Sequence, residues 1–338
     1  MLCIAAFIVF SILGIFSASY RKLAKKGWYC VMRKLTFRPC DINFSEELKG
    51  KMLGKLIFTH PKLANLLSRF ANVFAFVFVI LTIWSTLYVA QAGLNLYVYD
   101  TCNPQNVESC SLGGEACGID SLSSTDEFSV WNTLARIPDR WKTWEAKEYV
   151  PATVSYYGGY RADKPVALEI IDPSCKFCQK LGENIKAAGF TDRYNLAYIL
   201  YPIELWEEQY KFPHSYLMAS YIEASKKVPL ANTTITGDWQ LLEKIFSDSK
   251  DDKSMQEIFN ATQDVAVVTA QLQEYLKQIG YSDEQVLTIS KLSSSDEVKA
   301  SLKAQRTIVN EQIRTRKIPT ILFGGRRYDR VVDVDKLK

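Results

Sequence analysis

The stretch that decides the fold of this chain is VALEII, residues 166–171, followed closely by CKFC, residues 175–178. The first part is a short apolar run that predicts a buried β-strand, and the second begins a plausible helix. Two thiols three residues apart at a helix N-terminus can close a disulfide with almost no backbone movement. The positive end of the helix stabilises a thiolate at Cys175, and cysteines activated in this way have pKa values of roughly 3.5–7.5. The motif therefore predicts dithiol redox chemistry, with Cys175 as the exposed nucleophile and Cys178 as the resolving thiol.

Two other interpretations of the C-x-x-C pair are less favoured by the sequence. The pair is also half of a zinc site, and it can be an inert structural bridge. No second pair follows, and the only two histidines, His60 and His214, are far away in sequence, so a four-ligand zinc cluster would need scattered partners. We expect neither a metal nor an organic cofactor.

Glu169 is the one acid within the apolar run of the predicted strand. A buried carboxylate is costly unless it has a task. Its distance along the strand would set it beneath Cys178, where it could pass a proton through a water molecule. We therefore include Glu169 among the candidate catalytic residues.

Far downstream, IPT at residues 318–320 precedes a short apolar strand, residues 321–323, and a Gly-Gly turn. A strand, a C-x-x-C helix, a long excursion and X-Pro-Thr before a strand together resemble the thioredoxin superfamily over residues 151–338. Within it, the chain looks most like the DsbA-like thiol–disulfide oxidoreductases. The resemblance implies a cis Pro319 packed against the active-site disulfide, and an Ile318 backbone that pairs with bound substrate. The alternative for Pro319 is an ordinary strand-entry proline, since cis X-Pro bonds are uncommon.

The active-site motif departs from the family pattern at two places. Pro173 and Ser174 stand before the first cysteine, where the family usually has an aromatic residue. The central dipeptide is Lys176-Phe177, not Gly-Pro or Pro-His. This dipeptide helps to set the reduction potential, and the charge of Lys176 should favour the thiolate unless the side chain is simply solvated. The motif alone does not separate oxidase, reductase and isomerase.

The excursion between the two halves of the predicted fold, residues 203–316, has the periodicity of helices. We expect strands at 153–157, 166–171 and 195–201, and a hairpin over 324–332. The expected helices cover residues 214–227, 238–249, 254–279, 282–292 and 294–316. A final helix should follow the hairpin, but only residues 334–337 resemble its first turn, so we expect that helix to be truncated or replaced. The predicted fold class is α/β: a thioredoxin-like fold with a helical insertion, preceded by two transmembrane helices.

Two apolar runs near the N-terminus predict membrane spans at residues 1–20 and 71–94. Residues 21–72 contain twelve Lys or Arg and three acids, a net charge of +9 in a chain whose total is +4. The positive-inside rule then places residues 21–70 in the cytoplasm and both chain ends outside. Residues 95–150 become an extracytoplasmic linker, and residues 151–338 the catalytic domain. A nucleic-acid-binding basic loop is less favoured, because lipid headgroups account for juxtamembrane charge, and a cleaved signal peptide would need positive charge before the apolar run.

The remaining cysteines agree with that topology. Cys102, Cys110 and Cys117 are close together in the outer linker and are candidates for structural disulfides. We prefer a Cys102–Cys110 bridge, which leaves Cys117 free or paired elsewhere. Cys30, in the predicted cytoplasmic loop, should stay reduced.

These patterns predict a membrane-anchored thiol–disulfide oxidoreductase in a bacterial-type cell membrane, acting on the outer side. Its partners would be exported proteins with free thiols or disulfides, and a membrane redox partner that recharges the cysteine pair. Oxidation is the favoured direction. The alternatives are a disulfide reductase or isomerase, and a non-catalytic thioredoxin-like binding or scaffold protein.

Overall fold

The computed structural model describes residues 7–11, 15, 18–36, 61–99, 101–102, 115–119, 129–206, 209–231 and 233–338. The chain divides into two compact units, Met1–Gln91 and Ala92–Lys338. Helix α4 (Pro61–Tyr99) begins in the first unit and ends in the second.

The first unit is helical where it is described. Helix α2 (Ala18–Leu35) covers part of the segment that we expected to be a basic loop. Its many Lys, Arg, Ala and Leu residues are good helix formers, which accounts for the difference. Cys30 on this helix is disulfide-bonded, so the expectation of a reduced thiol is wrong. The expected first span, residues 1–20, lies largely outside the described residues.

One helix in the described part of the chain is long and apolar enough to cross a membrane, by length and composition. It is the stretch Ala75–Tyr99 of α4, which contains most of the predicted span 71–94. Trp84 and Tyr88 on it are 69% and 71% exposed.

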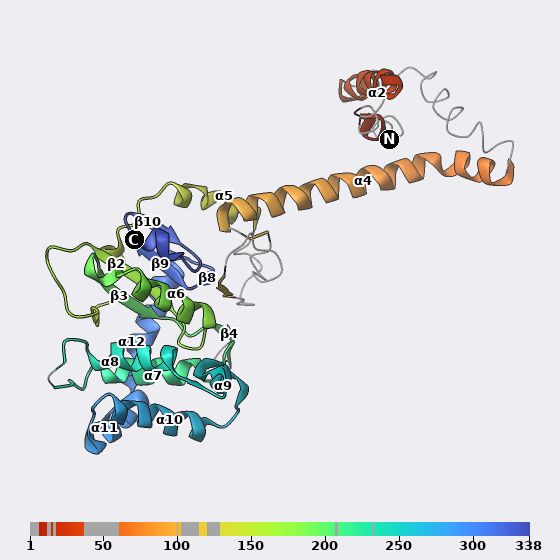
Figure 1. Ribbon diagram of the computed structural model, residues 1–338. Helices are drawn as coiled ribbons and strands as arrows, with labels where there is room; N and C mark the ends of the chain where they lie inside the picture. Colours follow the sequence, from red (N-terminus) through yellow and green to blue (C-terminus); the bar gives the residue numbers. More distant parts are fainter. Residues whose placement is uncertain are drawn as a thin grey trace. The chain divides into compact units, whose positions relative to one another are not determined.

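A four-stranded sheet forms the centre of the second unit (Figure 1). Its strand order is β10-β9-β2-β3, and β2 (Val166–Ile171) runs parallel to β3 (Asn195–Leu200). Strand β9 (Thr320–Phe323) is antiparallel both to β2 and to β10 (Arg326–Tyr328). Strands β2 and β3 are buried almost throughout, which explains why their sequences are continuous apolar runs. Two parallel strands joined by a helix, followed by an antiparallel hairpin, define a thioredoxin-like fold.

The helix that joins β2 to β3 is α6 (Lys176–Ala187). Its buried residues Cys178, Leu181 and Ile185 are spaced three and four apart, so one face packs against the core. The helix ends before Gly189, whose φ of 59° is the left-handed conformation common just after a helix. The short helix α13 (Val334–Leu337) packs against α6 at the end of the chain.

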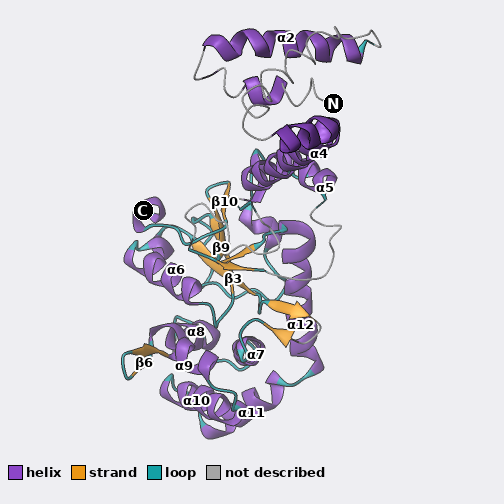
Figure 2. Ribbon diagram, turned by 90° about the vertical axis from the view of Figure 1, so that its right-hand side faces the viewer, coloured by secondary structure: helices purple, strands orange, loops and turns teal. Residues whose placement is uncertain are grey.

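The helical insertion is present and gathers to one side of the sheet (Figure 2). Its helices are α7 (Ser215–Ser225), α8 (Gly237–Ser247), α9 (Met255–Ala261), α10 (Val265–Gln278), α11 (Asp283–Ser293) and α12 (Asp296–Thr307). Capping boxes at Ser254 and Ser282 begin α9 and α11. The expected helix 254–279 is divided into α9 and α10. Asp264 is the N-cap of α10, and its side chain accepts a hydrogen bond from the amide of Ala266. The expected helix 294–316 continues beyond α12 as a π-helical turn, Ile308–Ile313.

The segment that we expected to be a linker packs onto the sheet of the second unit. Strand β1 (Cys117–Gly118) pairs with β8 (Lys317–Ile318), and the amide of Trp144 donates to the carbonyl of Gly325 at 2.9 Å. Three short helical turns complete the segment: α5 (Val130–Ala135), η3 (Ile137–Arg140) and η4 (Ala146–Tyr149). The expected strand 153–157 is reduced to a single bridge between Tyr156 and Ala197.

Short hairpins fill two of the connections. Strands β4 (Glu204–Trp206) and β5 (Gln209–Tyr210) follow β3, and strands β6 (Ser249–Lys250) and β7 (Lys253–Ser254) precede α9.

Candidate active site

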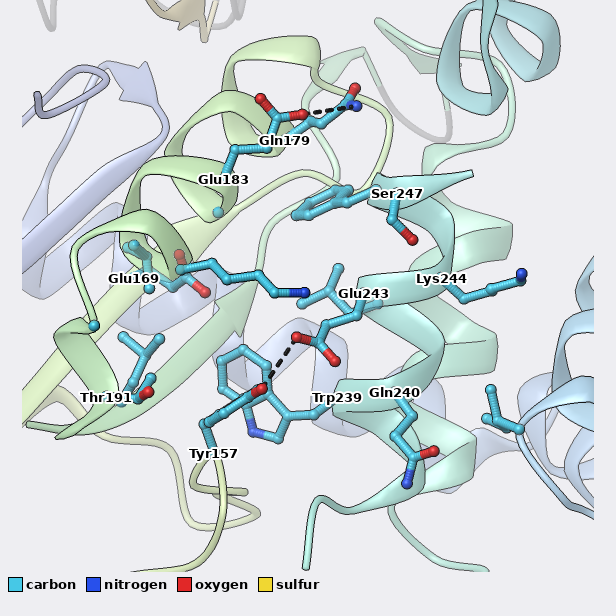
Figure 3. Close-up of a pocket in the computed structure, with 18 of the residues that line it drawn as sticks. Tyr157, Glu169, Gln179, Glu183, Thr191, Trp239, Gln240, Glu243, Lys244 and Ser247 are labelled. Carbon is cyan, nitrogen blue, oxygen red and sulfur yellow. Dashed lines mark hydrogen bonds between the residues drawn. The ribbon is translucent and has the colours of Figure 1, made fainter. Parts of the chain in front are cut away.

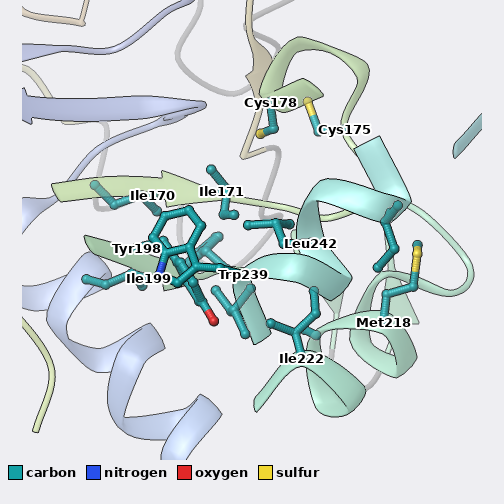
Figure 4. Packing of buried hydrophobic residues seen from close by; sticks show 14 of the residues in the cluster. Ile170, Ile171, Cys175, Cys178, Tyr198, Ile199, Met218, Ile222, Trp239 and Leu242 are labelled. Atoms are coloured by element: carbon teal, nitrogen blue, oxygen red, sulfur yellow. The ribbon is translucent and has the colours of Figure 1, made fainter. Parts of the chain in front are cut away.

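Cys175 is the N-cap residue of α6, as the sequence predicts. The chain leaves β2 at Ile171 and turns back at Asp172, whose carbonyl accepts the amide of Cys175 at 3.0 Å. Cys178 lies one turn into the helix, with its amide 2.9 Å from the carbonyl of Cys175. Residues three apart on a helix share a face, so both sulfurs belong to one site (Figure 4).

The disulfide at this site differs from the expected one. Cys175 is bonded to Cys117, with the two Cα atoms 6.7 Å apart, and Cys178 is a free, buried thiol. Cys175 is fully buried, so the expectation of an exposed nucleophile is wrong for this state of the protein. The physical reason is that Cys117, on β1, covers the sulfur. Cys102 is also disulfide-bonded, whereas Cys110, and with it the expected Cys102–Cys110 bridge, lies outside the described residues.

Strand β1 is held in place by backbone and side-chain contacts. Cys117 is paired with Ile318 and Gly118 with Lys317, in antiparallel register. The amide of Ile119 extends this pairing to the carbonyl of Arg316 at 3.0 Å. Cys117 thus lies beside the strand that leads into Pro319.

The loop before β9 brings a second part of the chain to the sulfurs. The Ile318–Pro319 peptide bond is cis. The carbonyl oxygen of Ile318 is 3.8 Å from Sγ of Cys175. Thr320, directly after the proline, hydrogen-bonds the carbonyl of Lys317 at 2.7 Å and so fixes the loop. Ile318 and Pro319 are therefore next to the reacting sulfur, although they are more than 140 residues away in sequence.

The thiol of Cys178 lies in an environment that disfavours its ionised form. Burial raises the pKa of Cys178 well above its ordinary value, and the negative charge of Asp172, with that of Glu169 when it is ionised, adds to the effect. The backbone amide of Asp172 opposes them by donating to Sγ of Cys178 at 3.4 Å. Cys178 is therefore mainly a protonated thiol at neutral pH.

Asp172 is a buried carboxylate that sequence reasoning missed. It accepts hydrogen bonds from the amide of Ser174 at 2.8 Å, the hydroxyl of Ser215 at 2.5 Å and the amide of Ile203 at 2.8 Å. Burial raises its pKa to about 6, although these bonds favour the charged form. Its position directly after the predicted strand and three residues before Cys175 was the signal that could have found it.

Glu169 is buried on β2, as expected, and borders a cavity of about 480 Å³ (Figure 3). Burial raises its pKa to about 8. Its charge acts on the pKa of Cys178, so the two groups are near one another, and no direct hydrogen bond joins them among the described contacts. On the far side of the cavity, Tyr157 donates to Glu243 of α8 at 3.1 Å. The cavity is large enough to hold water beside Glu169, and Cys178 is not among the residues that line it.

A groove of about 420 Å³ is lined by Cys117 and by residues on both sides of Cys175 in the sequence. Its lining combines aromatic, basic and amide side chains: Phe177, Phe212, Lys176, Lys211, Gln256 and Asn260, with Ala116, Cys117, Ser174 and Glu257. The ammonium of Lys176 lies 5.3 Å from the ring centroid of Phe177, and both side chains line the groove.

Three buried polar atoms in this groove have no hydrogen-bond partner among the described residues: Ser174 Oγ, Gln256 Oε1 and Asn260 Oδ1. The amide nitrogens of Gln256 and Asn260 are used, since they donate to the carbonyls of Pro173 and Ser174 at 2.6 and 3.1 Å. An unpaired buried polar atom costs free energy, so these three acceptors are unusual for a protein interior. Ser174 lies beside the motif, but the sequence gives no sign that Gln256 and Asn260 join it. In the described part of the chain, no group of three or more His, Cys, Asp or Glu could hold a metal.

No protein-family model matches the sequence, and no curated protein matches it. Among solved structures, the chain is similar to a thioredoxin-like oxidoreductase from Silicibacter pomeroyi DSS-3, with 12% identity and a TM-score of 0.39 over 55% of this chain and 88% of that one. It is also similar to the thiol-disulfide exchange protein alpha-DsbA2 from Wolbachia pipientis, with 16% identity and a TM-score of 0.38 over 56% and 87%. A third is the MdbA protein of Corynebacterium diphtheriae, a thiol-disulfide oxidoreductase, with 15% identity and a TM-score of 0.39 over 57% and 99%.

The strand order and the position of α6 define the class of the second unit by themselves: a thioredoxin-like domain with a helical insertion and a cysteine pair at the start of its first core helix.

Proposed function

We propose that the protein is a membrane-anchored thiol–disulfide oxidoreductase that exchanges disulfides with extracytoplasmic proteins through Cys175 and Cys178. The observation that carries the proposal is the position of the two cysteines. One caps α6 and is bonded to an extended segment of chain, and the other is a free thiol one turn along the same helix.

In the proposed reaction, a substrate thiolate attacks Sγ of Cys175 in the Cys175–Cys178 disulfide. Cys178 leaves and takes up a proton, and a mixed disulfide between substrate and Cys175 remains. A second thiolate of the same substrate then attacks the substrate sulfur of this mixed disulfide. The substrate is thereby oxidised by two electrons, and Cys175 leaves as a thiolate. Glu169, with its pKa of about 8, exchanges protons with Cys178 through water. A membrane redox partner re-oxidises the pair.

Oxidation is the direction that the site favours. The N-terminus of α6 stabilises the thiolate of Cys175, and a stabilised reduced form raises the reduction potential. The second candidate, a reductase or isomerase, uses the same cysteines with a lower potential. A scaffold would need neither cysteine for binding.

The reduction potential of the pair distinguishes these functions. We expect the purified full-length protein in detergent to have a potential well above that of thioredoxin, about −270 mV, and to oxidise reduced, unfolded ribonuclease faster than glutathione disulfide does. The measurement is equilibration with glutathione redox buffers, followed by alkylation and peptide mapping of Cys175 and Cys178. A potential near −270 mV would assign the protein to the reductases.

We further propose a two-pass topology, with spans at 1–20 and 71–94, residues 21–70 in the cytoplasm and the second unit outside. The apolar stretch Ala75–Tyr99 and the net charge of +9 over residues 21–72 support it. The disulfide-bonded Cys102 and Cys117 agree with an oxidising compartment. The disulfide at Cys30 speaks against a reducing environment for the basic segment.

Thiol labelling of intact cells after mild reduction tests this topology. An impermeant maleimide should label Cys102 and Cys117 and should miss Cys30, because the membrane would shield the basic segment. Permeabilised cells provide the control, in which all three should react. Labelling of Cys30 in intact cells would exclude the two-pass arrangement.

The groove beside the sulfurs is the proposed binding site for the substrate backbone. Ser174→Ala removes a buried hydroxyl that has no partner among the described residues, so stability should stay the same or rise. If the hydroxyl bonds a substrate, one lost hydrogen bond of about 0.5–1.5 kcal/mol should raise KM by roughly 2- to 12-fold with little change in kcat. Steady-state oxidation of a cysteine-containing peptide, with thermal unfolding in parallel, measures both. Ser247→Ala, on α8 and outside this groove, is the matched control, and equal KM values for the two variants would remove Ser174 from the binding site.

A further inference from the structure

The segment that carries Cys117 lies where a peptide bonded to Cys175 has to lie. A mixed disulfide between the reactive cysteine and a second chain segment is the intermediate of thiol–disulfide exchange. The Cys117–Cys175 bridge has this form, with the backbone of β1 paired to β8 beside the sulfur. An incoming substrate cannot reach Sγ of Cys175 from this side until β1 moves.

The segment is also fixed beyond the disulfide. The carboxylate of Glu115 forms an ion pair with Lys180 of α6 at 2.6 Å. The backbone carbonyl of Glu115 accepts a hydrogen bond from the amide of Val331 at 3.0 Å. On the other side of the cysteine, Lys211 donates to the carbonyl of Gly118 at 3.2 Å. Ala116, Cys117 and Ile119 are buried. These contacts hold the segment beside Cys175 in addition to the disulfide.

We propose that Cys117 is a third reacting cysteine, which exchanges the disulfide of Cys175 with Cys178 and occupies the substrate position while it holds that bond. The proposal rests on the proposed function, since it uses the same two cysteines. It replaces the role of structural bridge that the sequence suggested for Cys117.

The exchange step needs no external oxidant. Cys178 loses its proton, and its thiolate attacks Sγ of Cys175. The Cys175–Cys178 bond forms as the Cys117–Cys175 bond breaks, and Cys117 leaves as a thiolate that takes up the proton. One disulfide and one thiol are present before and after the step. The state with Cys117 bonded to Cys175 is a protected form of the enzyme, and the state with Cys175 bonded to Cys178 is the form that can accept a substrate thiol.

The buried position of Cys178 explains why the protected form persists. The thiolate that must attack is disfavoured by burial and by the charge of Asp172 in the turn after β2, to which Glu169 on β2 adds when it is ionised. The amide of Asp172 is the group that supports it. Exchange should therefore be slow near neutral pH and faster as pH rises.

A pH jump on the full-length protein tests the proposal. The oxidised protein in detergent is moved from pH 6 to pH 9 with no oxidant or reductant, and is sampled into acid, alkylated and mapped by non-reducing mass spectrometry. We expect the alkylated thiol to change from Cys178 to Cys117 as the disulfide moves to Cys175–Cys178. In Cys178→Ser, which lacks the attacking sulfur, the Cys117–Cys175 bridge should stay unchanged at both pH values. A wild-type bridge that remains at Cys117–Cys175 through the pH 9 incubation would overturn the proposal.

Cys117→Ser separates this proposal from the proposed function. Without the competing thiol, its disulfide should be Cys175–Cys178 alone, and because no internal exchange has to precede reaction, the first turnover of a cysteine-containing peptide should be several-fold faster than in the wild type. A first turnover at the wild-type rate, with substrate still oxidised, overturns only the role of Cys117. If a well-folded Cys117→Ser protein and the wild type both oxidise no substrate, the role of Cys117 and the proposed function are both overturned. Lys180→Gln provides a variant that keeps all three sulfurs but loses the ion pair to Glu115, and it should also shift the population toward Cys175–Cys178.

Discussion

Cys175→Ser is expected to reduce the oxidation of an unfolded protein substrate to the background rate of glutathione disulfide alone. Its sulfur is the atom that forms the mixed disulfide, and no other described cysteine lies at the N-cap of a core helix beside the Pro319 loop. A serine hydroxyl cannot form that bond. The measurement is the initial rate of thiol loss from reduced ribonuclease, with circular dichroism to show that the variant is folded.

The control for this loss is the Cys102→Ser variant. Cys102 is disulfide-bonded but lies outside the C-x-x-C pair, so the variant should retain turnover. Replacing both Cys117 and Cys178 with serine should leave Cys175 as the only reacting thiol of the site. Given a disulfide-linked peptide dimer, that variant should accumulate a mixed disulfide: the Cys175 thiolate attacks the dimer, one peptide leaves as a thiolate, and neither internal thiol can release the other. Undiminished substrate binding by a Cys175→Ser/Cys178→Ser protein, together with a wild type that does not turn over, would instead indicate a scaffold.

The second large effect concerns stability, and it comes from Glu169. Burial raises the pKa of this carboxyl from an ordinary 4.5 to about 8 in the folded protein. Below pH 4.5 the Glu169 carboxyl is neutral in both the folded and the unfolded protein, so its ionisation does not change the free energy of unfolding. Between 4.5 and 8 the unfolded chain releases the proton and the folded chain keeps it, so stability falls as pH rises, by about 1.4 kcal/mol for each pKa unit.

Glu169→Gln should therefore stabilise the protein at pH 9 by several kcal/mol, and by little at pH 4. Urea unfolding at both pH values measures the difference. Glu183→Gln, an exposed residue at the rim of the same cavity, should show no such pH-dependent gain. Because Glu169 is also the proposed proton relay, its variant should lower the turnover rate on the order of 100-fold. Parallel stability profiles for Glu169→Gln and the wild type would show that Glu169 does not titrate in this range.

Local sequence determined the parts of this protein that depend on neighbours along the chain. The run at 166–171 is strand β2, and Cys175 caps a helix because an apolar period of three and four starts directly after it. The helical insertion was predicted to within a few residues at α7, α8 and α11, where serine or aspartate lies at or beside the helix start. Hydrophobic period and cap chemistry act over a few residues, so one sequence is enough to reveal them.

Tertiary structure alone decided which sulfur meets Cys175. Cys117 is 58 residues away in sequence, and only the pairing of β1 with β8 brings it to the N-terminus of α6 ahead of the nearby Cys178. The same holds for the groove, where Ser174 meets Gln256 and Asn260 from the helical insertion. Such contacts depend on how separate elements pack, and the free energies that select one packing are sums over many residues. No short pattern in the sequence contains that information, which is why the motif predicted the chemistry of this site but not the partner of its reactive cysteine.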